Sequence, residues 1–168
     1  FIVFAPDYRM MPENAFECCV RDVTAAYKWR EENIAAYPAE KERVYVVGDS
    51  AGAYLAALCT MTAKSERLQT VYGAVGSGLD IKAMGLISGM FDFDWKSVFT
   101  HGIRRMALHK RKKDDPVRKN YTLDMPEVKY LPPCYMVTSA DDNFISAGMT
   151  DDFAALLERH GTPYYYRY

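Results

Sequence analysis

The sequence predicts an α/β fold, in which a mainly parallel β-sheet is flanked by helices. Short, strongly apolar runs alternate along the chain with longer segments whose apolar residues recur at helical spacing. Strands that alternate with helices in this way are typical of parallel sheets. The first of these runs, over residues 1–5, is apolar throughout, as expected of a parallel strand covered on both faces. With 168 residues and 49% hydrophobic content, we expect one domain over residues 1–168 that buries its own core.

The first two elements expected are a strand over residues 1–5 and a helix that starts near Asn14. The strand is predicted because Phe-Ile-Val-Phe-Ala contains no polar residue. Asn14 can cap the helix, with Glu17 three positions further on, as in a capping box. Apolar residues then recur at helical spacing as far as Ile34, and Pro38 is expected to end this region.

The most informative segment is the Gly-x-Ser-x-Gly motif at residues 48–52. It follows an apolar strand over residues 44–47 and leads into an alanine-rich helix, expected over Ser50–Lys64. Strand, sharp turn and helix, in this order, form the context of a nucleophile elbow, a strained turn that presents a serine at its apex. Gly48 and Gly52 are expected to omit Cβ atoms that would collide with the adjoining strand and helix.

The elbow motif assigns a role to two groups. Ser50 would act as the nucleophile, with its hydroxyl pushed out over the carboxyl edge of the sheet. The backbone N–H of Ala51, at the start of the helix, would face the oxyanion of a tetrahedral intermediate. A tight turn that merely contains a serine is the alternative, and the flanking strand and helix favour the elbow.

The second half of the chain continues the alternation of strands and helices. Strands are expected at Met84–Ser88, at Cys134–Thr138 and from Thr162 to Tyr168. The helix between the last two would be capped by Ser146 and stopped by Gly161.

Residues of about 93–130 follow neither pattern. We therefore expect a short, cap-like insertion there, lying over the carboxyl edge of the sheet. The basic run at residues 110–113 belongs to this segment and is followed by two aspartates, which favours a solvated cap surface over a nucleic-acid site.

Charge and composition exclude several classes of partner. Acidic and basic residues nearly cancel, 22 against 21, so no overall field favours nucleic acid. No apolar run approaches the roughly 20 residues that a membrane-spanning helix needs. No signal peptide precedes Phe1, and a cytoplasmic location is expected.

The cysteines give no sign of a metal centre. Cys18, Cys19, Cys59 and Cys134 lack metal-ligand spacing and fall within the expected helices and a strand. Buried free thiols are therefore expected, with no metal site.

Several blocks of sequence, in a fixed order, carry a family resemblance. They are Asp7-Tyr8-Arg9 with Pro12-Glu13, Arg21-Asp22-Val23 with Ala26-Tyr27-Lys28-Trp29, Gly48-Asp49-Ser50-Ala51-Gly52, and Leu131-Pro132-Pro133 with the run from Thr138 to Phe144. In these blocks the chain resembles the hormone-sensitive-lipase-like esterases and lipases, a branch of the α/β-hydrolases, over nearly its whole length. The resemblance implies a partial α/β-hydrolase core. It also implies a carboxylic-ester hydrolase that forms an acyl-enzyme with short-chain acyl esters and needs no cofactor.

The resemblance further implies that Asp142 is the acid that orients a catalytic histidine. Asn143 and Phe144 stand where the family has Pro-Leu after the acid, which favours Asp142 over its neighbour Asp141. A carboxylate at the carboxyl end of a strand can accept the imidazole N–H and stabilise the imidazolium. Either aspartate could instead cap the turn before the next helix.

Two parts of the family's catalytic apparatus are expected outside these 168 residues. The resemblance places a His-Gly-Gly-Gly-type oxyanion loop before Phe1 and the catalytic histidine just beyond Tyr168. His101 and His109 fall in the insertion and His160 closes a helix, so structural or solvated roles are expected for all three. The chain is therefore expected to be truncated at both ends and close to inert by itself. Unpaired sheet edges or exposed apolar surface would favour self-association.

Two other functions stay open. The first is a non-catalytic binding protein that keeps the elbow and lacks the histidine. The second is a serine peptidase or acyltransferase, which would pass the acyl group to an amine or a peptide. For an ester hydrolase, the aromatic residues Phe91, Phe93, Trp95 and Phe99 sit where the insertion could line an acyl pocket.

Overall fold

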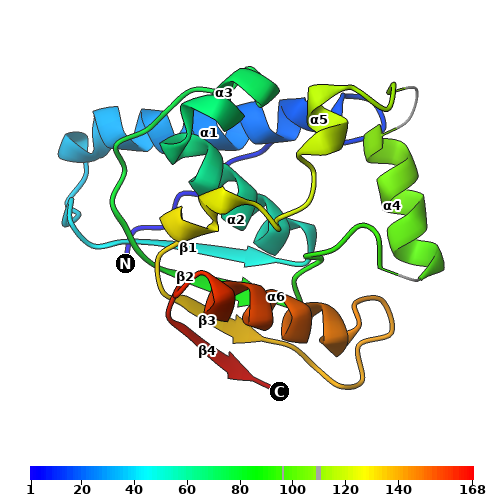
Figure 1. Ribbon diagram of the computed structural model, residues 1–168. Helices are drawn as coiled ribbons and strands as arrows, with labels where there is room; N and C mark the ends of the chain where they lie inside the picture. The colour runs from blue at the N-terminus through cyan, green and yellow to red at the C-terminus, as the bar shows by residue number, and fades with distance from the viewer. Residues whose placement is uncertain (96, 109–110) are drawn as a thin grey trace.

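A four-stranded, fully parallel sheet forms the base of the structure, a computed structural model of residues 1–168. The structure describes every residue except 96 and 109–110. The strands are β1 (Val44–Asp49), β2 (Ile81–Ile87), β3 (Cys134–Val137) and β4 (Tyr164–Arg167), and they lie in the order β1-β2-β3-β4. The parallel α/β sheet expected from the sequence is confirmed (Figure 1).

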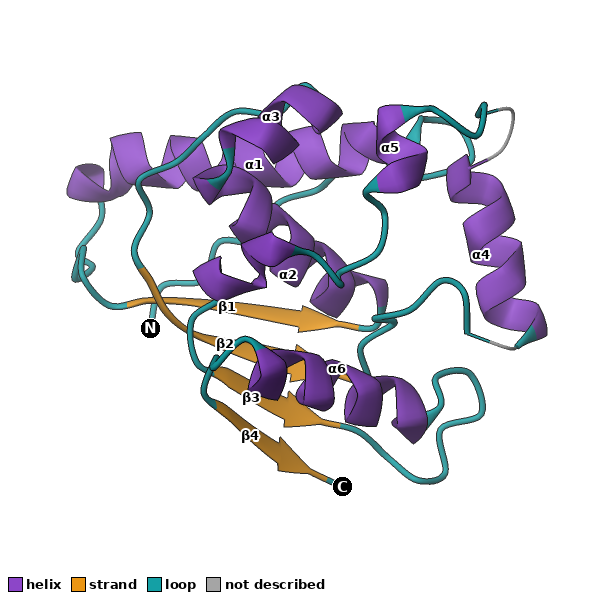
Figure 2. Ribbon diagram, viewed as in Figure 1, coloured by secondary structure: helices purple, strands orange, loops and turns teal. Residues whose placement is uncertain are grey.

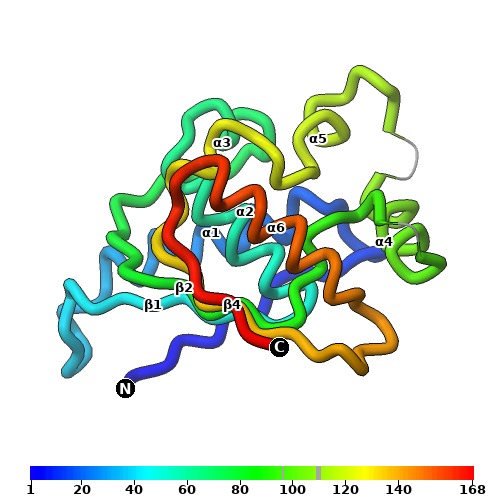
Figure 3. The backbone as a smooth tube through the Cα atoms, turned by 60° about the horizontal axis from the view of Figure 1, so that its bottom comes forward, coloured from blue at the N-terminus to red at the C-terminus, as the bar shows by residue number. Residues whose placement is uncertain are grey.

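The helices lie on one side of this sheet (Figures 2 and 3). They are α1 (Phe16–Asn33), α2 (Ala51–Lys64), α3 (Glu66–Tyr72), α4 (Val98–Leu108), α5 (Pro116–Lys119) and α6 (Ala147–Arg159), with 3-10 turns η1 (Ile34–Ala36) and η2 (Pro126–Tyr130). Neighbouring parallel strands in chain order are joined by right-handed crossovers, which place successive helices on the same face.

Helix α2 is the centre of the core. Every residue from Ala53 to Ala63 is buried, and the helix contacts β1, β2, α1, α3 and η2. A helix that is apolar around its whole circumference has no face for solvent and must be enclosed. The alanine-rich segment after the Gly-x-Ser-x-Gly motif therefore becomes the element around which α1, α3 and η2 pack.

The other face of the sheet is open. Tyr45, Val47, Ile87, Tyr135 and Tyr165 are exposed there, on four adjacent strands. Burial on both faces was expected for the run over residues 1–5 alone. Along β1 and β3 the residues alternate between more and less exposed positions, as expected of strands whose helices cover one face only.

The apolar segment over residues 1–5 forms no strand, so that prediction is wrong. A strand needs a partner edge for its backbone groups, and β1 pairs only with β2. Phe4 packs instead on Trp29 and Tyr37, with ring centroids 5.8 and 5.1 Å apart. An apolar run is equally suited to this helix-side packing.

The start of α1 also differs from the prediction. Its N-cap is Ala15, which has no side chain that can cap. The Asn14 side chain donates backwards to the Met10 carbonyl at 3.3 Å. Asn14 therefore closes the preceding turn, and it lies one residue before the position from which a side chain caps the helix.

Helix α3 was not predicted from the sequence. Ser65 caps it by accepting from the Leu68 N–H at 3.3 Å, and Gly73 ends it in the left-handed conformation with φ 61°. Both are ordinary helix boundary signals. Helix α3 follows α2 after a single residue, so the apolar periodicity shows no gap to separate them.

The β3–α6–β4 unit matches its prediction. Ser146 caps α6 by accepting from the Gly148 N–H at 3.3 Å. Gly161 follows the helix with φ 68°, a backbone conformation that glycine adopts without strain.

The segment of about 93–130 contains α4, α5 and η2, and buried polar contacts tie it to the body. The backbone carbonyls of Asn120 and Tyr121 accept hydrogen bonds from the buried hydroxyls of Tyr72 and Tyr54. Glu127 is buried and accepts from Arg67 Nε at 2.8 Å and Nη2 at 2.9 Å. These contacts hold the segment against α2 and α3.

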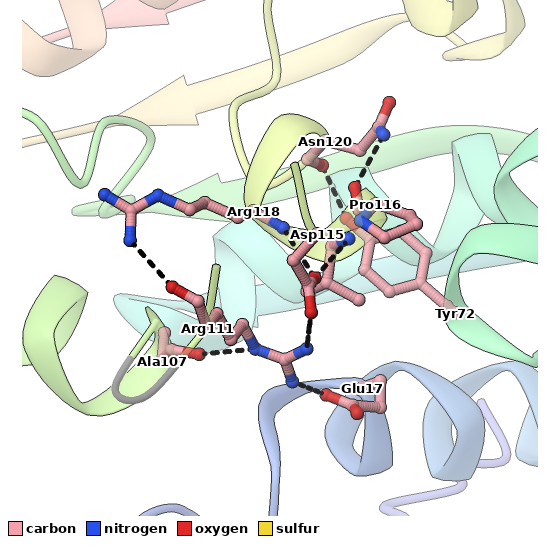
Figure 4. A network of polar contacts seen from close by, with 9 residues as sticks. Glu17, Tyr72, Ala107, Arg111, Asp115, Pro116, Arg118 and Asn120 are labelled. Carbon is pink, nitrogen blue, oxygen red and sulfur yellow. Dashed lines mark hydrogen bonds and ion pairs between the residues drawn. The ribbon is translucent and has the colours of Figure 1, made fainter. Parts of the chain in front are cut away.

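Arg111 provides a further tether between this segment and α1 (Figure 4). Its guanidinium pairs with Glu17 of α1 and, at 3.3 Å, with both oxygens of Asp115. Its Nε donates to the Ala107 carbonyl at 3.3 Å. The Arg111 side chain is only 15% exposed. If the arginine were removed, few water molecules could reach its acceptors to replace the lost hydrogen bonds.

We expect Arg111→Ala to lower the free energy of unfolding by about 2–4 kcal/mol, because it leaves two half-buried carboxylates without their cation. Arg43→Ala is the matched control, since Arg43 pairs with Glu40 where the side chains are 63% and 68% exposed. An exposed pair of this kind contributes about 0–1 kcal/mol. Urea unfolding followed by circular dichroism measures both, and equal losses would contradict the tether.

Candidate active site

Ser50 stands alone between strand β1 and helix α2. The strand ends at Asp49 and the helix begins at Ala51. Ser50 has φ 55° and ψ −118°, a conformation that is strained for a residue with a Cβ and is held by its surroundings. Its side chain is half-buried. The strand, sharp turn and helix predicted around the Gly-x-Ser-x-Gly motif are confirmed.

The two glycines of the motif have different surroundings. A Cβ added at Gly48 would lie 2.3 Å from the Gly52 carbonyl oxygen and 2.6 Å from the Ala53 nitrogen. A Cβ at Gly52 would meet nothing within 4 Å among the described residues. The predicted collision is therefore confirmed at Gly48 and wrong at Gly52. Only Gly48 stands where the strand passes the backbone of the helix.

The end of β2 and the turn after it hold the backbone of Ser50 through hydrogen bonds. The Ser50 N–H donates to the Ile87 carbonyl at 2.9 Å, and the Ser50 carbonyl accepts from the Met90 N–H at 3.2 Å. In the same turn, the Ser88 N–H donates to Val137 of β3 at 2.8 Å. The carboxyl ends of three adjacent strands are thus joined at one edge of the sheet.

The N–H of Ala51 is the first of helix α2. An N–H in the first helical turn has no partner within its own helix and lies at the positive end of the helix dipole. Among the described residues, no hydrogen bond occupies it. This arrangement matches the donor expected of an oxyanion site, and its role in catalysis stays a prediction.

Asp142 follows β3 at the same edge. Its Oδ1 accepts from the N–H groups of Phe144 and Ile145, each at 2.9 Å. The backbone hydrogen bonds from Ile145 and Phe144 lower the pKa of Asp142, and the Ser88 hydroxyl lowers it further. The carboxylate is thereby kept ionised at neutral pH.

The rival, Asp141, is exposed, and its backbone N–H donates to Ser139 Oγ at 3.2 Å. The turn-capping role considered for these aspartates is therefore present at Asp142, through Oδ1. The second oxygen, Oδ2, stays outside both backbone hydrogen bonds and leaves the carboxylate able to accept a further donor.

The histidines do not complete a triad in the described structure. His101 is exposed on α4, and no hydrogen bond joins it to Ser50 or Asp142. His160 follows the end of α6 and precedes β4, so it lies at the amino edge of the parallel sheet, opposite Ser50. His109 lies outside the described residues. Within the described chain, no base contacts the Ser50 hydroxyl.

A cavity of about 350 Å³ adjoins Asp142. It is lined by Trp95, Ser97, Ala140, Asp142, Asn143, Phe144, Ser146 and Ala147. Phe99 lies beside it, with its ring centroid 5.7 Å from that of Phe144. Aromatic side chains from the start of the 93–130 segment (Trp95 and Phe99) and from the loop after β3 (Phe144) therefore lie next to the candidate acid.

Two of the four aromatic residues expected at an acyl pocket belong to the core instead. Phe91 is buried and stacks on Phe153 with ring centroids 4.1 Å apart. Phe93 is buried against Tyr54 at 4.5 Å. Only Trp95 and Phe99 lie near the cavity. Sequence position alone could not distinguish the core residues Phe91 and Phe93 from Trp95 and Phe99, because all four follow β2 in one short stretch of the chain.

The cysteines are free thiols, as expected, and Cys18 alone is half-buried. Burial raises the pKa of Cys19 to about 11 and that of Cys134 to about 12, and it also raises the pKa of Cys59. These three thiols stay protonated at neutral pH and are unsuited to act as nucleophiles. The described residues contain no group of three or more His, Cys, Asp and Glu side chains that could hold a metal ion. None of the described helices has the length and apolar character to cross a membrane.

The strand order, the elbow and the acidic loop define an α/β hydrolase. A sequence model of the alpha/beta hydrolase fold matches residues 1–168, and the chain belongs to this family. The resemblance to hormone-sensitive-lipase-like esterases is thereby confirmed.

Two relatives and one solved structure illustrate the similarity, and each carries an esterase name. The chain is 26% identical over 177 residues to a probable isoprenylcysteine alpha-carbonyl methylesterase of Oryza sativa subsp. japonica, covering 95% of this chain and 41% of that protein. It is 23% identical over 166 residues to esterase LipQ of Mycobacterium tuberculosis, covering 96% and 39%.

The crystal structure of esterase B from Lactobacillus rhamnosis has the same fold, with a TM-score of 0.81 at 17% identity, covering 95% of this chain and 52% of that one. The chain thus spans about two-fifths of the length of these relatives and about half of the solved structure.

We expect Gly48→Ala to destabilise the protein by about 3 kcal/mol or more, because its Cβ would overlap backbone atoms that cannot rotate away. Gly52→Ala is the control in the same motif. Its Cβ meets nothing within 4 Å, and alanine in a helix stabilises by about 0.5–1 kcal/mol relative to glycine. Thermal unfolding compares the two variants. If Gly48→Ala melted like Gly52→Ala, the close approach of β1 and α2 would be wrong.

Proposed function

We propose that this chain carries the nucleophile and the acid of a serine carboxylesterase that forms an acyl-enzyme with short-chain acyl esters. The observation that supports this most directly is the strained backbone of Ser50 at the carboxyl edge of the sheet, with Asp142 following a strand at the same edge. Strain in a residue that is not glycine is typical of functional sites, where the fold maintains it.

In the proposed reaction, the Ser50 hydroxyl attacks the ester carbonyl and a histidine outside these 168 residues takes its proton. Asp142 accepts the imidazole N–H, orients the ring and stabilises the imidazolium that forms. The Ala51 N–H donates to the oxyanion of the tetrahedral intermediate. When that intermediate collapses, the imidazolium returns its proton to the leaving oxygen, the alcohol departs and the acyl group stays on Ser50. Water, deprotonated by the same histidine, then attacks the acyl group and releases the carboxylic acid.

The size of the cavity beside Asp142 supports the proposal that the substrate is small. Its volume of about 350 Å³ lies near the lower end of ligand sites, which span about 300–1,000 Å³. Its wall of Trp95 and Phe144 offers apolar surface for an acyl or alcohol group. The names of the relatives also favour ester hydrolysis over transfer to an amine.

We expect Ser50→Ala to reduce the hydrolysis of short p-nitrophenyl esters by the full-length protein by about 10⁴-fold or more, since triad members act as a unit. Ser77→Ala serves as the control. Ser77 precedes β2, so it lies toward the amino edge of the sheet, where its hydroxyl bonds Glu31 at 3.0 Å.

Initial rates at saturating ester measure the effect. Wild-type turnover in Ser50→Ala would refute the nucleophile. A full-length protein that binds esters without hydrolysing them would favour the non-catalytic binding function instead.

We also propose that the isolated 168-residue chain pairs with a second copy through the open face of the sheet. Exposed apolar side chains on four adjacent strands form a continuous patch there, and patches of this kind favour association.

We expect Val47→Lys, at a side chain that is 70% exposed on this face, to shift the light-scattering mass of the isolated chain toward that of a monomer. Val98→Lys is the control, because Val98 is 94% exposed on α4, away from the sheet. A monomeric wild-type chain would refute the pairing.

A further inference from the structure

Gly148 lies in the first turn of helix α6, where its backbone does not require glycine. In the part of the chain that the structure describes, the glycines with positive φ are Gly73 and Gly161. Gly148 belongs instead to the regular helix Ala147–Arg159, and glycine within a helix is less stable than alanine. The reason for glycine at this position therefore lies in what packs against it.

The indole ring of Trp95 occupies the space of the missing side chain. A Cβ at Gly148 would lie 2.7 Å from Cη2 and 3.0 Å from Cζ2 of Trp95. Both distances are shorter than the optimal separation of two carbon atoms, which is about 3.5–4.0 Å. The ring thus packs directly on the backbone of α6, with no side chain between them.

The backbone of Trp95 is held from another element, the start of helix α4. The Trp95 carbonyl accepts from the Thr100 hydroxyl at 2.6 Å and from the Ser97 N–H at 2.8 Å. Thr100 is fully buried in α4. The Trp95 side chain therefore extends from a fixed position in the 93–130 segment to the first turn of α6.

This placement makes the indole a fixed wall of the cavity beside Asp142. Trp95 is the largest of the residues that line the cavity. The other aromatic residue of the lining, Phe144, is 66% exposed, so solvent leaves its ring free to rotate. Trp95 is half-buried and is held at both ends. The indole, rather than the phenyl ring, therefore sets how far an alkyl chain can extend into the cavity.

We propose that Trp95 is a specificity-determining residue: its indole, packed on Gly148, closes the cavity beside Asp142 and restricts the ester to a short alkyl chain. The chain that enters the cavity belongs to the acyl or to the alcohol part of the ester, and the experiment distinguishes the two. The discrimination between chains rests on the proposed function. The contact between Trp95 and Gly148 does not.

The contact is tested by ¹⁹F NMR of the full-length protein labelled with 5-fluorotryptophan, the signal of Trp95 being assigned with Trp95→Phe. The label leaves Cη2 and Cζ2, the two contact atoms, unchanged. We expect Gly148→Ala to shift this signal by more than its linewidth, because the new Cβ displaces the ring. Gly102→Ala is the matched control, since a Cβ at Gly102 of α4 would meet nothing within 4 Å. A Trp95 signal that stays in place in Gly148→Ala overturns the contact.

The discrimination is tested by kcat/KM of the full-length protein on two series of esters. The first series varies the acyl chain of p-nitrophenyl esters, and the second varies the alkyl chain of acetate esters. We expect Trp95→Ala to raise kcat/KM for the octyl-length chain relative to the butyl-length chain by about 10-fold or more in one series. A pocket that comes to admit further methylenes gains about this much, and the series that responds identifies the chain in the cavity.

Trp29→Ala is the matched control for the kinetic test. Trp29 lies on α1 and packs on Phe4 and Tyr37, and none of these three residues lines the cavity. We expect its chain-length preference to equal that of wild type. A preference that is unchanged by Trp95→Ala in both series overturns the proposal.

Trp95→Phe decides the question if circular dichroism shows that Trp95→Ala does not fold. It keeps an apolar ring of smaller size, so a smaller shift toward long chains is expected, and an unchanged preference again overturns the proposal. Failure of the proposed function has a different signature. Ser50→Ala would then keep wild-type turnover, whereas the ¹⁹F signal would still report on the contact between Trp95 and Gly148.

Discussion

The structure depends on the close approach of two backbones, at the end of β1 and the start of α2. A Cβ at Gly48 would lie 2.3 Å from the Gly52 carbonyl, so the chain reverses direction within one residue, and that residue is Ser50. The same approach seats helix α2, buried from Ala53 to Ala63, against the sheet, where α1, α3 and η2 pack on it. One steric constraint therefore sets both the core and the conformation of the candidate nucleophile.

Backbone hydrogen bonds carry the alignment of the site across the sheet. The end of β2 binds the Ser50 N–H, and the turn after β2 binds the Ser50 carbonyl. The same turn is hydrogen-bonded to β3. Side chains on rigid elements are placed more precisely than side chains on free loops. Asp142 does lie in a loop, and hydrogen bonds from the backbone N–H groups of Phe144 and Ile145 fix its carboxylate there. The geometry of the site thus depends on the carboxyl ends of β1, β2 and β3, and not only on the Gly-x-Ser-x-Gly motif.

The segment over residues 93–130 is anchored by polar contacts rather than by strand pairing. Arg111 joins it to α1, and Arg67 with Glu127 joins it to α3. These charges are at least partly shielded from solvent, so removing one partner leaves the other without compensation. The fold shared with esterase B at 17% identity shows that the sheet and its helices tolerate wide substitution.

The sequence by itself determined the elements whose signals are local. The elbow glycine at position 48, the Ser146 cap and the alternation of strands and helices depend on neighbours within a few residues, and all three were predictable. The strand expected over residues 1–5, the covering of the sheet, the collision at Gly52, and the core positions of Phe91 and Phe93 depended on which distant segment lies beside them. Ser88 shows the same limit: it was expected only as the end of a strand. Its backbone hydrogen bond to Val137 follows from the strand order β1-β2-β3, because hydrogen bonds between strands join residues far apart in the chain that no local pattern relates.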